Sequence, residues 1–200
     1  MLTPKALADL CAEAYTNKPT WQVDNAAALS VAFADCTVVA FRGTQLTDPE
    51  DIFRDLDAWP VFVPKLGVLH RGFWQGAHSL LPFMPAHGPL VITGHSLGGA
   101  MAIDTVAYMV AHELWRKDEV QLVTFGAPRA GGGGLRKVLK HCFVEQYEHV
   151  DDPIPPEPWF FDHVVEPTRI GVGIFNPIAN HFIYSYQMAL AAMEQPKEKV

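Results

Sequence analysis

A serine between two glycines is the residue of this sequence best suited to do chemistry. It lies in the pattern G-x-S-x-G, here Gly94-His95-Ser96-Leu97-Gly98. A serine hydroxyl is a weak nucleophile unless it is exposed and paired with a base. This pattern places the serine on a sharp turn from a strand into a helix. Residues 89–93 are apolar and β-branched, which predicts a buried strand, and residues 96–115 predict a long helix. The context therefore favours a nucleophilic Ser96 over an ordinary glycine-rich connection.

The same turn predicts two donors for a developing negative charge. The first N–H groups of a helix have no intrahelical acceptor and point toward anions. The Leu97 N–H is therefore a predicted oxyanion donor. The Thr44 N–H is the predicted second donor, because it follows an expected strand at residues 37–41 and Gly43 permits close backbone approach. An ordinary turn after that strand is the alternative.

A serine nucleophile needs a base and an acid, which on such folds follow it in the order acid, then histidine. Asp152 is the predicted acid, because it closes an expected strand and the following proline holds it extended. Asp151 is the rival acid. His181 and His163 are then the two histidines that remain as bases. His181 is favoured, because it lies at a junction between a loop and a helix, whereas His163 lies within an aromatic loop. The predicted roles are those of a Ser-His-Asp triad.

Other clusters carry weaker signals. An acyl pocket is a candidate role for several side chains, although packing in the core is the alternative for each: His95, Trp59, Phe62, Trp159 and Phe175. His112-Glu113 has no second histidine at metal-binding spacing. Residues 131–134 are four glycines without the lysine of a phosphate loop, and predict a flexible loop. We expect neither a metal nor a cofactor.

Composition limits the class of protein. The chain has 200 residues, of which 49% are hydrophobic and 18% charged, which predicts one domain over residues 1–200. The net charge of -7 disfavours nucleic acid and anionic membranes as partners. Three widely spaced cysteines predict free, mostly buried thiols. The expected partner is a small-molecule or lipid ester, and the oligomeric state is left open.

Location is predicted from apolar stretches. Asp9 interrupts the apolar character of the N-terminus, so it does not resemble a secretion signal. Residues 98–114 form the most apolar later stretch, and they carry Asp104, His112 and Glu113. That stretch is too short and too polar to span a bilayer. We expect a soluble chain without stable membrane insertion, cytoplasmic by default, with secretion not excluded.

Hydrophobic patterns predict the elements that position these residues. Helices are expected at 3–15, 72–81, 96–115, 135–141 and 181–194, and strands at 29–33, 37–41, 89–93, 120–125 and 143–150. Residues 153–180 form a loop-rich excursion with an expected hairpin at 164–174. Strands that alternate with helices predict an α/β fold, with a mainly parallel sheet covered by helices on both faces.

The ordered motifs resemble the class 3 lipases, the fungal-type triacylglycerol lipases and their feruloyl esterase relatives. The similar segments are VVAFRGT at 38–44, LHRGFW at 69–74, VITGHSLGGA at 91–100, TFGAPR at 124–129, HVDDPIP at 149–155 and NHFIY at 180–184. The resemblance covers about residues 37–186 and aligns Asp152, rather than Asp151, with the acid. It implies the α/β-hydrolase fold, a Ser96-Asp152-His181 triad and an oxyanion hole from Thr44 and Leu97. The implied activity is hydrolysis of acylglycerols or similar esters through an acyl-enzyme.

The chain departs from that family at its candidate lid, residues 45–60. This stretch is mostly polar and acidic, whereas a lid that opens onto oil exposes a broad apolar face. It predicts a preference for soluble esters of short or medium acyl chains over emulsified long-chain fat. A feruloyl or carbohydrate-acetyl esterase is the nearest alternative. A catalytically silent binding protein is disfavoured, because every triad member is present.

Overall fold

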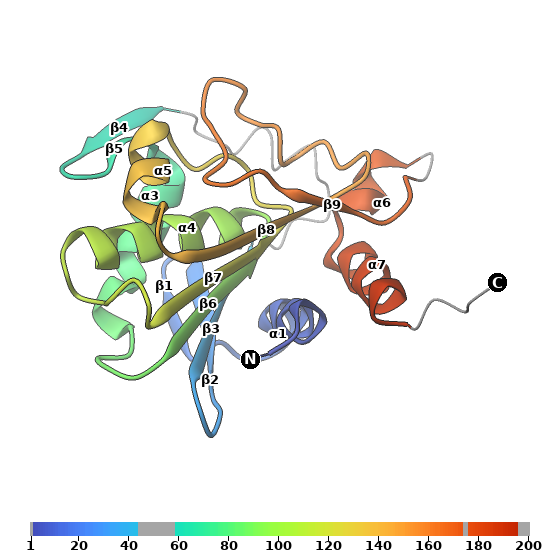
Figure 1. The fold of residues 1–200 in the computed structure, drawn as a ribbon, viewed down its shortest axis with the longest axis horizontal. Coiled ribbons are helices and arrows are strands. Elements are labelled where there is room, and N and C mark those ends of the chain that lie inside the picture. The colour runs from blue at the N-terminus through green and yellow to red at the C-terminus, as the bar shows by residue number, and fades with distance from the viewer. Residues whose placement is uncertain (1, 44–58, 174–175, 196–200) are drawn as a thin grey trace.

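A seven-stranded sheet forms the centre of the molecule (Figure 1). The computed structural model describes residues 2–43, 59–173 and 176–195. The strand order is β1-β2-β3-β6-β7-β8-β9, and β4 and β5 form a separate two-stranded sheet. The strands are β1 (Trp21–Val23), β2 (Ala26–Ala32), β3 (Thr37–Phe41), β4 (Pro60–Val63), β5 (Gly67–His70), β6 (Leu90–His95), β7 (Val120–Phe125), β8 (Phe143–His149) and β9 (Thr168–Ile170).

The sheet is mainly parallel. β1 pairs with β2 and β2 pairs with β3 in antiparallel fashion, and the remaining neighbours, from β3 to β9, are parallel. All six residues of β6 are buried, because this strand lies between β3 and β7 with helices over both faces. A continuous apolar strand is typical of such a position. The carboxyl ends of the parallel strands consequently share one edge of the sheet, where β6 delivers Ser96.

Helices cover both faces, as predicted. The helices are α1 (Pro4–Thr16), α3 (Arg71–Leu80), α4 (Leu97–Ala111), α5 (Gly133–Leu139), α6 (Pro177–His181) and α7 (Ile183–Glu194), with a short 3-10 turn at Leu81–Phe83. One buried cluster joins α3, α4 and α5 to the sheet. A second joins α1 and α7 to the opposite face, where these two helices pack against each other (Figure 1). Such a sheet, with its strand-to-helix turn at Ser96, is the α/β-hydrolase fold.

Several expectations differ from the structure in detail. The hairpin expected at residues 164–174 is wrong, because β9 pairs in parallel with β8 at the sheet edge. The glycine run is no slack loop, because Gly133 and Gly134 open α5, and a side chain at Gly134 would overlap the carbonyl oxygen of Leu66. The final helix is divided, with α6 ending at His181. Strand β1 and the β4–β5 hairpin were not predicted, since both are short and lack strict alternation.

Other expectations agree with it. The predicted helices near residues 3–15, 72–81 and 96–115 correspond to α1, α3 and α4, and the five predicted strands correspond to β2, β3, β6, β7 and β8. All three cysteines are free, as expected, but only Cys11 is fully buried. Most of the candidate lid, residues 45–58, lies outside the described residues.

Candidate active site

Ser96 lies on a strained turn between β6 and α4. Its backbone φ is 57°, a left-handed value that is uncommon for a residue with a side chain. Two flanking glycines make this turn possible. A Cβ at Gly94 would overlap the backbone of Gly98, and a Cβ at Gly98 would overlap the carbonyl oxygen of Phe41 at the end of β3. The spacing of the motif is therefore a packing requirement, since α4 begins in contact with both β6 and β3.

Ser96, His181 and Asp152 form a continuous hydrogen-bonded row. The Ser96 Oγ lies 2.8 Å from His181 Nε2, and His181 Nδ1 lies 2.9 Å from Asp152 Oδ2 and 3.0 Å from Oδ1. All three residues are buried. They are 29 and 85 positions apart in the two His181 contacts, so only the fold brings them together.

The partners of His181 select one tautomer of the neutral ring. An ionised carboxylate can only accept, so Nδ1 carries the proton and donates it to Asp152. The neutral ring then leaves Nε2 unprotonated, and Nε2 accepts the hydroxyl hydrogen of Ser96. This is the tautomer that a general base needs, because Nε2 is ready to take the proton of the attacking hydroxyl.

Asp152 is fixed by two further donors. The Ile154 N–H donates to Oδ1 at 2.9 Å, and the Tyr186 hydroxyl donates to Oδ2 at 2.5 Å. Tyr186 itself accepts from the His149 N–H at 3.0 Å. Burial and the neighbouring carboxylate raise the pKa of Tyr186 well above its usual value, so its proton stays in place to donate. Each carboxyl oxygen therefore has a second donor in addition to His181, which fixes the carboxylate in place.

The rival residues lie elsewhere. Asp151 is exposed and adopts a positive φ of 62° in the turn after β8, which directs the chain so that Asp152, and not Asp151, reaches the site. His163 lies in the loop after β8, where its carbonyl accepts from Arg136. Burial and the nearby arginines lower the pKa of His163 to about 4. It occupies a structural position, distinct from the Ser96 contact that His181 makes.

The two predicted oxyanion donors differ in what the structure describes. Leu97 is the first residue of α4, so its N–H has no intrahelical acceptor. Thr44 lies outside the described residues. Gly43, just before it, is described. A Cβ built on Gly98 would lie 2.9 Å from the Gly43 nitrogen, so the backbone at Gly43 passes beside the turn that carries Ser96.

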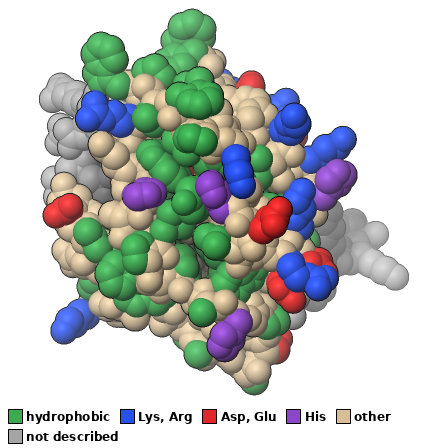
Figure 2. Space-filling view, turned by 90° about the vertical axis from the view of Figure 1, so that its left-hand side faces the viewer, with side chains coloured by type: hydrophobic (Ala, Val, Ile, Leu, Met, Phe, Trp, Pro, Cys, Tyr) green, Lys and Arg blue, Asp and Glu red, His purple; other side chains and the backbone are tan. Residues whose placement is uncertain are grey.

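The predicted pocket side chains are scattered. Trp59, Phe62 and Trp159 expose 68%, 71% and 78% of their surface, so none is enclosed in a pocket of the described residues. Phe175 lies outside those residues. Figure 2 shows hydrophobic side chains gathered at the top of one face, the end of the molecule where Figure 1 places the β4–β5 hairpin. A role for these aromatic side chains in acyl binding stays a prediction.

His95 occupies a different kind of place. It is buried, and both ring nitrogens have partners: Nδ1 lies 2.9 Å from the Tyr15 hydroxyl, and Nε2 lies 2.7 Å from the carbonyl oxygen of His181. Burial, with the nearby His181, lowers the pKa of His95 to about 3, so the ring is neutral. Both polar atoms of the His95 side chain are therefore hydrogen-bonded within the protein, which leaves neither ring nitrogen to contact a substrate.

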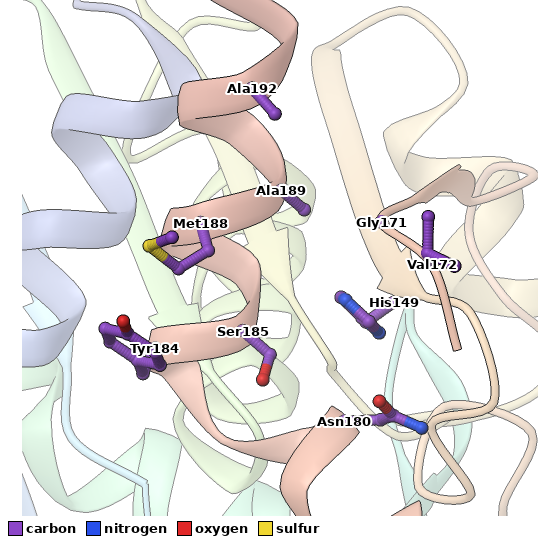
Figure 3. A pocket seen from close by; sticks show the side chains of 9 residues that line it. All are labelled: His149, Gly171, Val172, Asn180, Tyr184, Ser185, Met188, Ala189 and Ala192. Carbon is purple, nitrogen blue, oxygen red and sulfur yellow. The ribbon is translucent and has the colours of Figure 1, made fainter. Parts of the chain in front are cut away.

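A groove of about 290 Å³ lies between α7 and the chain that follows β9. In Figure 3, Ser185, Ala189 and Ala192 of α7 point across it toward His149 and Val172. Asn180 also lines it, next to His181, but Ser96 does not. The groove is therefore separate from the predicted nucleophile, although it adjoins the base through Asn180.

The described residues contain neither a metal-site cluster nor a membrane-spanning helix. Within residues 2–43, 59–173 and 176–195, no cluster of three or more histidine, cysteine or acidic side chains has the arrangement of a metal site. Within the same ranges, no helix is long and apolar enough to cross a bilayer.

Comparisons with known proteins place the chain in a family. The fold is that of the α/β hydrolases, and the family model for class 3 lipases matches residues 38–161. The protein belongs to the class 3 lipase family. This match includes Ser96 and Asp152, whereas His181 lies beyond it.

Three relatives illustrate the similarity. A secreted mono- and diacylglycerol lipase of Fusarium solani is 30% identical, over 51% of this chain and 39% of that protein. The Rhizomucor miehei lipase in complex with its propeptide is 18% identical with a TM-score of 0.65, covering 78% of this chain and 62% of that one. A triacylglycerol lipase described as having a serine protease triad at its catalytic centre is 19% identical with a TM-score of 0.66, covering 78% and 73%. The chain thus spans less than two thirds of the first two relatives.

Two residues of this site were not identified from the sequence. Tyr15 lies on α1, 80 positions from His95, and nothing near it in the chain marks it as a partner of the site. Tyr186 lies five residues after His181, in a helix with two aromatic side chains. Its one signal is a hydroxyl on the buried side of α7, which sequence periodicity alone does not separate from its neighbour Tyr184.

Proposed function

We propose that the protein is a serine-dependent carboxylic-ester hydrolase that acts on acylglycerols or similar acyl esters. The observation that carries this proposal is the row formed by Ser96, His181 and Asp152, with contacts of 2.8 and 2.9 Å and Ser96 on the strained turn. Membership of the class 3 lipases supports the same activity. The proposal makes Ser96 the nucleophile, His181 the base and Asp152 the acid.

The contacts support a two-step reaction. As the Ser96 oxygen attacks the ester carbonyl carbon, His181 Nε2 takes the hydroxyl proton and Asp152 stabilises the resulting imidazolium. The oxygen of the tetrahedral intermediate would accept from the N–H groups of Leu97 and Thr44. His181 then returns the proton to the leaving alcohol, and an acyl-enzyme remains. Water, deprotonated by the same Nε2, attacks the acyl-enzyme and releases the carboxylic acid and free Ser96.

A lipid ester is the substrate class that the chain favours. Its relative in Fusarium solani is named as a mono- and diacylglycerol lipase. Large exposed hydrophobic side chains on β4 and in the loop after β8, including Phe62, Trp159 and Phe160, suit contact with an acyl chain. The predicted preference for soluble esters rests on residues 45–58, which lie outside the described residues, and it stays a prediction.

Location and partners remain proposals as well. The expected cytoplasmic location has no support from the comparisons, because the Fusarium solani relative is named as secreted. The absence of nucleic-acid partners and of stable membrane insertion stays a prediction from net charge and hydropathy.

Ser96→Ala tests the activity directly. The variant should lose hydrolysis of a p-nitrophenyl ester and labelling by a fluorophosphonate, since both need an activated serine oxygen. Ser79→Ala is a matched control, because the Ser79 hydroxyl only donates to the Gly76 carbonyl within α3. The control should keep both signals. Full hydrolysis by Ser96→Ala, in a variant that unfolds like the wild type, would contradict the proposal.

An ester panel tests the substrate class with the same enzyme. Soluble short-chain esters, mono- and diacylglycerols, emulsified triglyceride, a feruloyl ester and an acetylated sugar would be compared by kcat/KM. Acylglycerols or simple acyl esters should be preferred. A preference for the feruloyl ester or the acetylated sugar would replace the lipid substrate with the alternative esterase. An abrupt rise in rate at the solubility limit of the substrate would refute the predicted preference for soluble esters.

A further inference from the structure

A second chain of hydrogen bonds runs from α1 to the backbone of the proposed base. The Tyr15 hydroxyl meets His95 Nδ1 at 2.9 Å, and His95 Nε2 meets the carbonyl oxygen of His181 at 2.7 Å. The Tyr15 oxygen also accepts a hydrogen bond from the backbone of Gly43. None of these contacts is part of the reaction described above.

The direction of each bond in this chain follows from its ends. A carbonyl oxygen only accepts, so His95 Nε2 carries the proton and donates it to His181. The ring is neutral, because burial lowers its pKa to about 3, and Nδ1 is therefore an acceptor. Burial raises the pKa of Tyr15, so its hydroxyl keeps a proton and donates it to Nδ1. The donors run in one direction, from Gly43 through Tyr15 and His95 to His181.

The chain of bonds ends at a backbone carbonyl at the end of a helix. His181 is the last residue of α6, and α7 begins at Ile183. The carbonyl groups at a helix end have no intrahelical donor. His95 supplies one, and so fixes the main chain at the residue whose side chain must reach Ser96. The imidazole of His181 can then move only about its own side-chain bonds.

The other end of this chain of hydrogen bonds lies against Gly43, which follows β3 and precedes the predicted oxyanion donor Thr44. Gly43 is enclosed between the Tyr15 hydroxyl and the carbonyl oxygen of His95, and a Cβ there would overlap the hydroxyl. The same tyrosine therefore contacts the backbone beside the predicted oxyanion donor and the histidine that holds the base. Because α1 also packs against α7, one helix braces both parts of the site.

We propose that Tyr15 and His95 are positioning residues that align the main chain of His181 and the backbone at Gly43 with Ser96. This inference rests on the proposed ester hydrolase activity. His95 bonds to the carbonyl oxygen of His181 and not to its imidazole, although the two ring centroids lie 4.9 Å apart. Tyr15 and His95 act by fixing the position of the base relative to the backbone at Gly43. Misalignment of such groups lowers the rate of reaction more than it lowers substrate binding.

Tyr15→Phe tests this role, because it removes one hydroxyl and keeps the ring. We expect kcat for a soluble ester to fall about tenfold with little change in KM, and the rate of fluorophosphonate labelling to fall in parallel. The matched control is Tyr147→Phe, which removes a tyrosine hydroxyl that bonds to Glu145 on β8. The control should keep the wild-type kcat. A kcat of Tyr15→Phe equal to that of the control would overturn the inference and leave the proposed function standing.

His95 gives a second comparison that does not depend on Tyr15. The side-chain amide that His95→Gln introduces can still donate toward the His181 carbonyl, whereas the ring that His95→Phe introduces has no donor. The His95→Gln variant should therefore retain more kcat than His95→Phe. Equal losses in two folded variants would overturn the role of the donated bond.

A measurement independent of activity separates the two proposals. Nitrogen-15 NMR of labelled histidines should show His95 neutral with its proton on Nε2, and Tyr15→Phe should shift the Nδ1 signal. Absence of ester hydrolysis by the wild-type protein would refute the proposed function. The spectrum would still test the hydrogen-bond network, because it reports the position of the His95 proton and does not depend on catalysis. A proton on Nδ1 of His95 would overturn the network, and one on Nε2 would support it.

Discussion

Tyr186→Phe removes one hydroxyl at the centre of the site and leaves the ring in place. That hydroxyl donates to Asp152 Oδ2 at 2.5 Å and accepts from the His149 N–H at 3.0 Å. The tyrosine is fully buried, and Asp152 is nearly so. Water cannot readily replace the lost partner. The substitution therefore leaves a buried N–H without an acceptor and a carboxylate with one donor fewer.

The expected cost follows from these two bonds. A hydrogen bond to a charged group contributes about 1.5–3 kcal/mol, and an orphaned buried N–H costs about 1–3 kcal/mol. Local relaxation makes the sum an upper bound, so the free energy of unfolding should fall by about 3 kcal/mol. For a chain of this length that corresponds to about 6–12 °C in the midpoint of thermal unfolding. Because His181 still donates to Asp152, kcat should fall only about tenfold, or about 1.4 kcal/mol.

The assay combines urea unfolding with ester hydrolysis. Tyr184→Phe is the control, because it removes a tyrosine hydroxyl two residues away on the same helix, from a side chain that is 66% exposed. That change should alter the free energy of unfolding by less than about 0.5 kcal/mol. If Tyr186→Phe is as stable as the control and as active as the wild type, the reasoning about the buried hydroxyl is refuted.

Two further substitutions test the packing around α4. Both carboxyl oxygens of Asp104 are buried with no hydrogen-bond partner among the described residues, and burial raises its pKa well above the usual value. In the folded state the Asp104 carboxyl therefore keeps a proton that the unfolded chain releases above a pKa of about 3.9. The stability that this bound proton contributes is fully present below the unfolded pKa and is lost as pH rises through the folded pKa. Asp104→Asn should therefore gain stability relative to the wild type as pH increases in urea titrations, and parallel pH profiles would contradict this. In Gly98→Ala the free energy of unfolding should fall by about 1–3 kcal/mol and most ester hydrolysis should be lost, because the new Cβ would overlap the Phe41 carbonyl. The control Gly133→Ala has open space around its new Cβ and should keep both stability and activity. Similar effects of the two substitutions would disprove the steric explanation.

Local sequence determined the parts of the site that depend on neighbours in the chain. The apolar run before Ser96, the flanking glycines and the helix after them all predict one turn, because strand, turn and helix preferences agree over a few residues. The mainly parallel sheet also followed from local pattern, since apolar strands alternate with amphipathic helices. The predicted helix began at Ser96, one residue before the observed start of α4 at Leu97.

Pattern failed where the partner of a segment is distant. Residues 168–170 have too few residues to show a period, and their pairing with β8 depends on which edge of the sheet is free. The glycines at the start of α5 predict a loop on propensity, but close packing against Leu66 requires that Gly134 lack a side chain. Such contacts join residues far apart in the chain, so no local signal encodes them.

The sequence by itself determined which side chains could react; the tertiary structure decided which of them meet. From the order of residues along the chain, either Asp151 or Asp152 could be the acid, and either His163 or His181 could be the base. The positive φ of Asp151 and the end of α6 at His181 select one of each pair, because they set the direction in which each side chain leaves the backbone. Tyr15 and Tyr186 joined the site only in three dimensions, since α1 and α7 pack together on one face of the sheet and bring both hydroxyls to its edge.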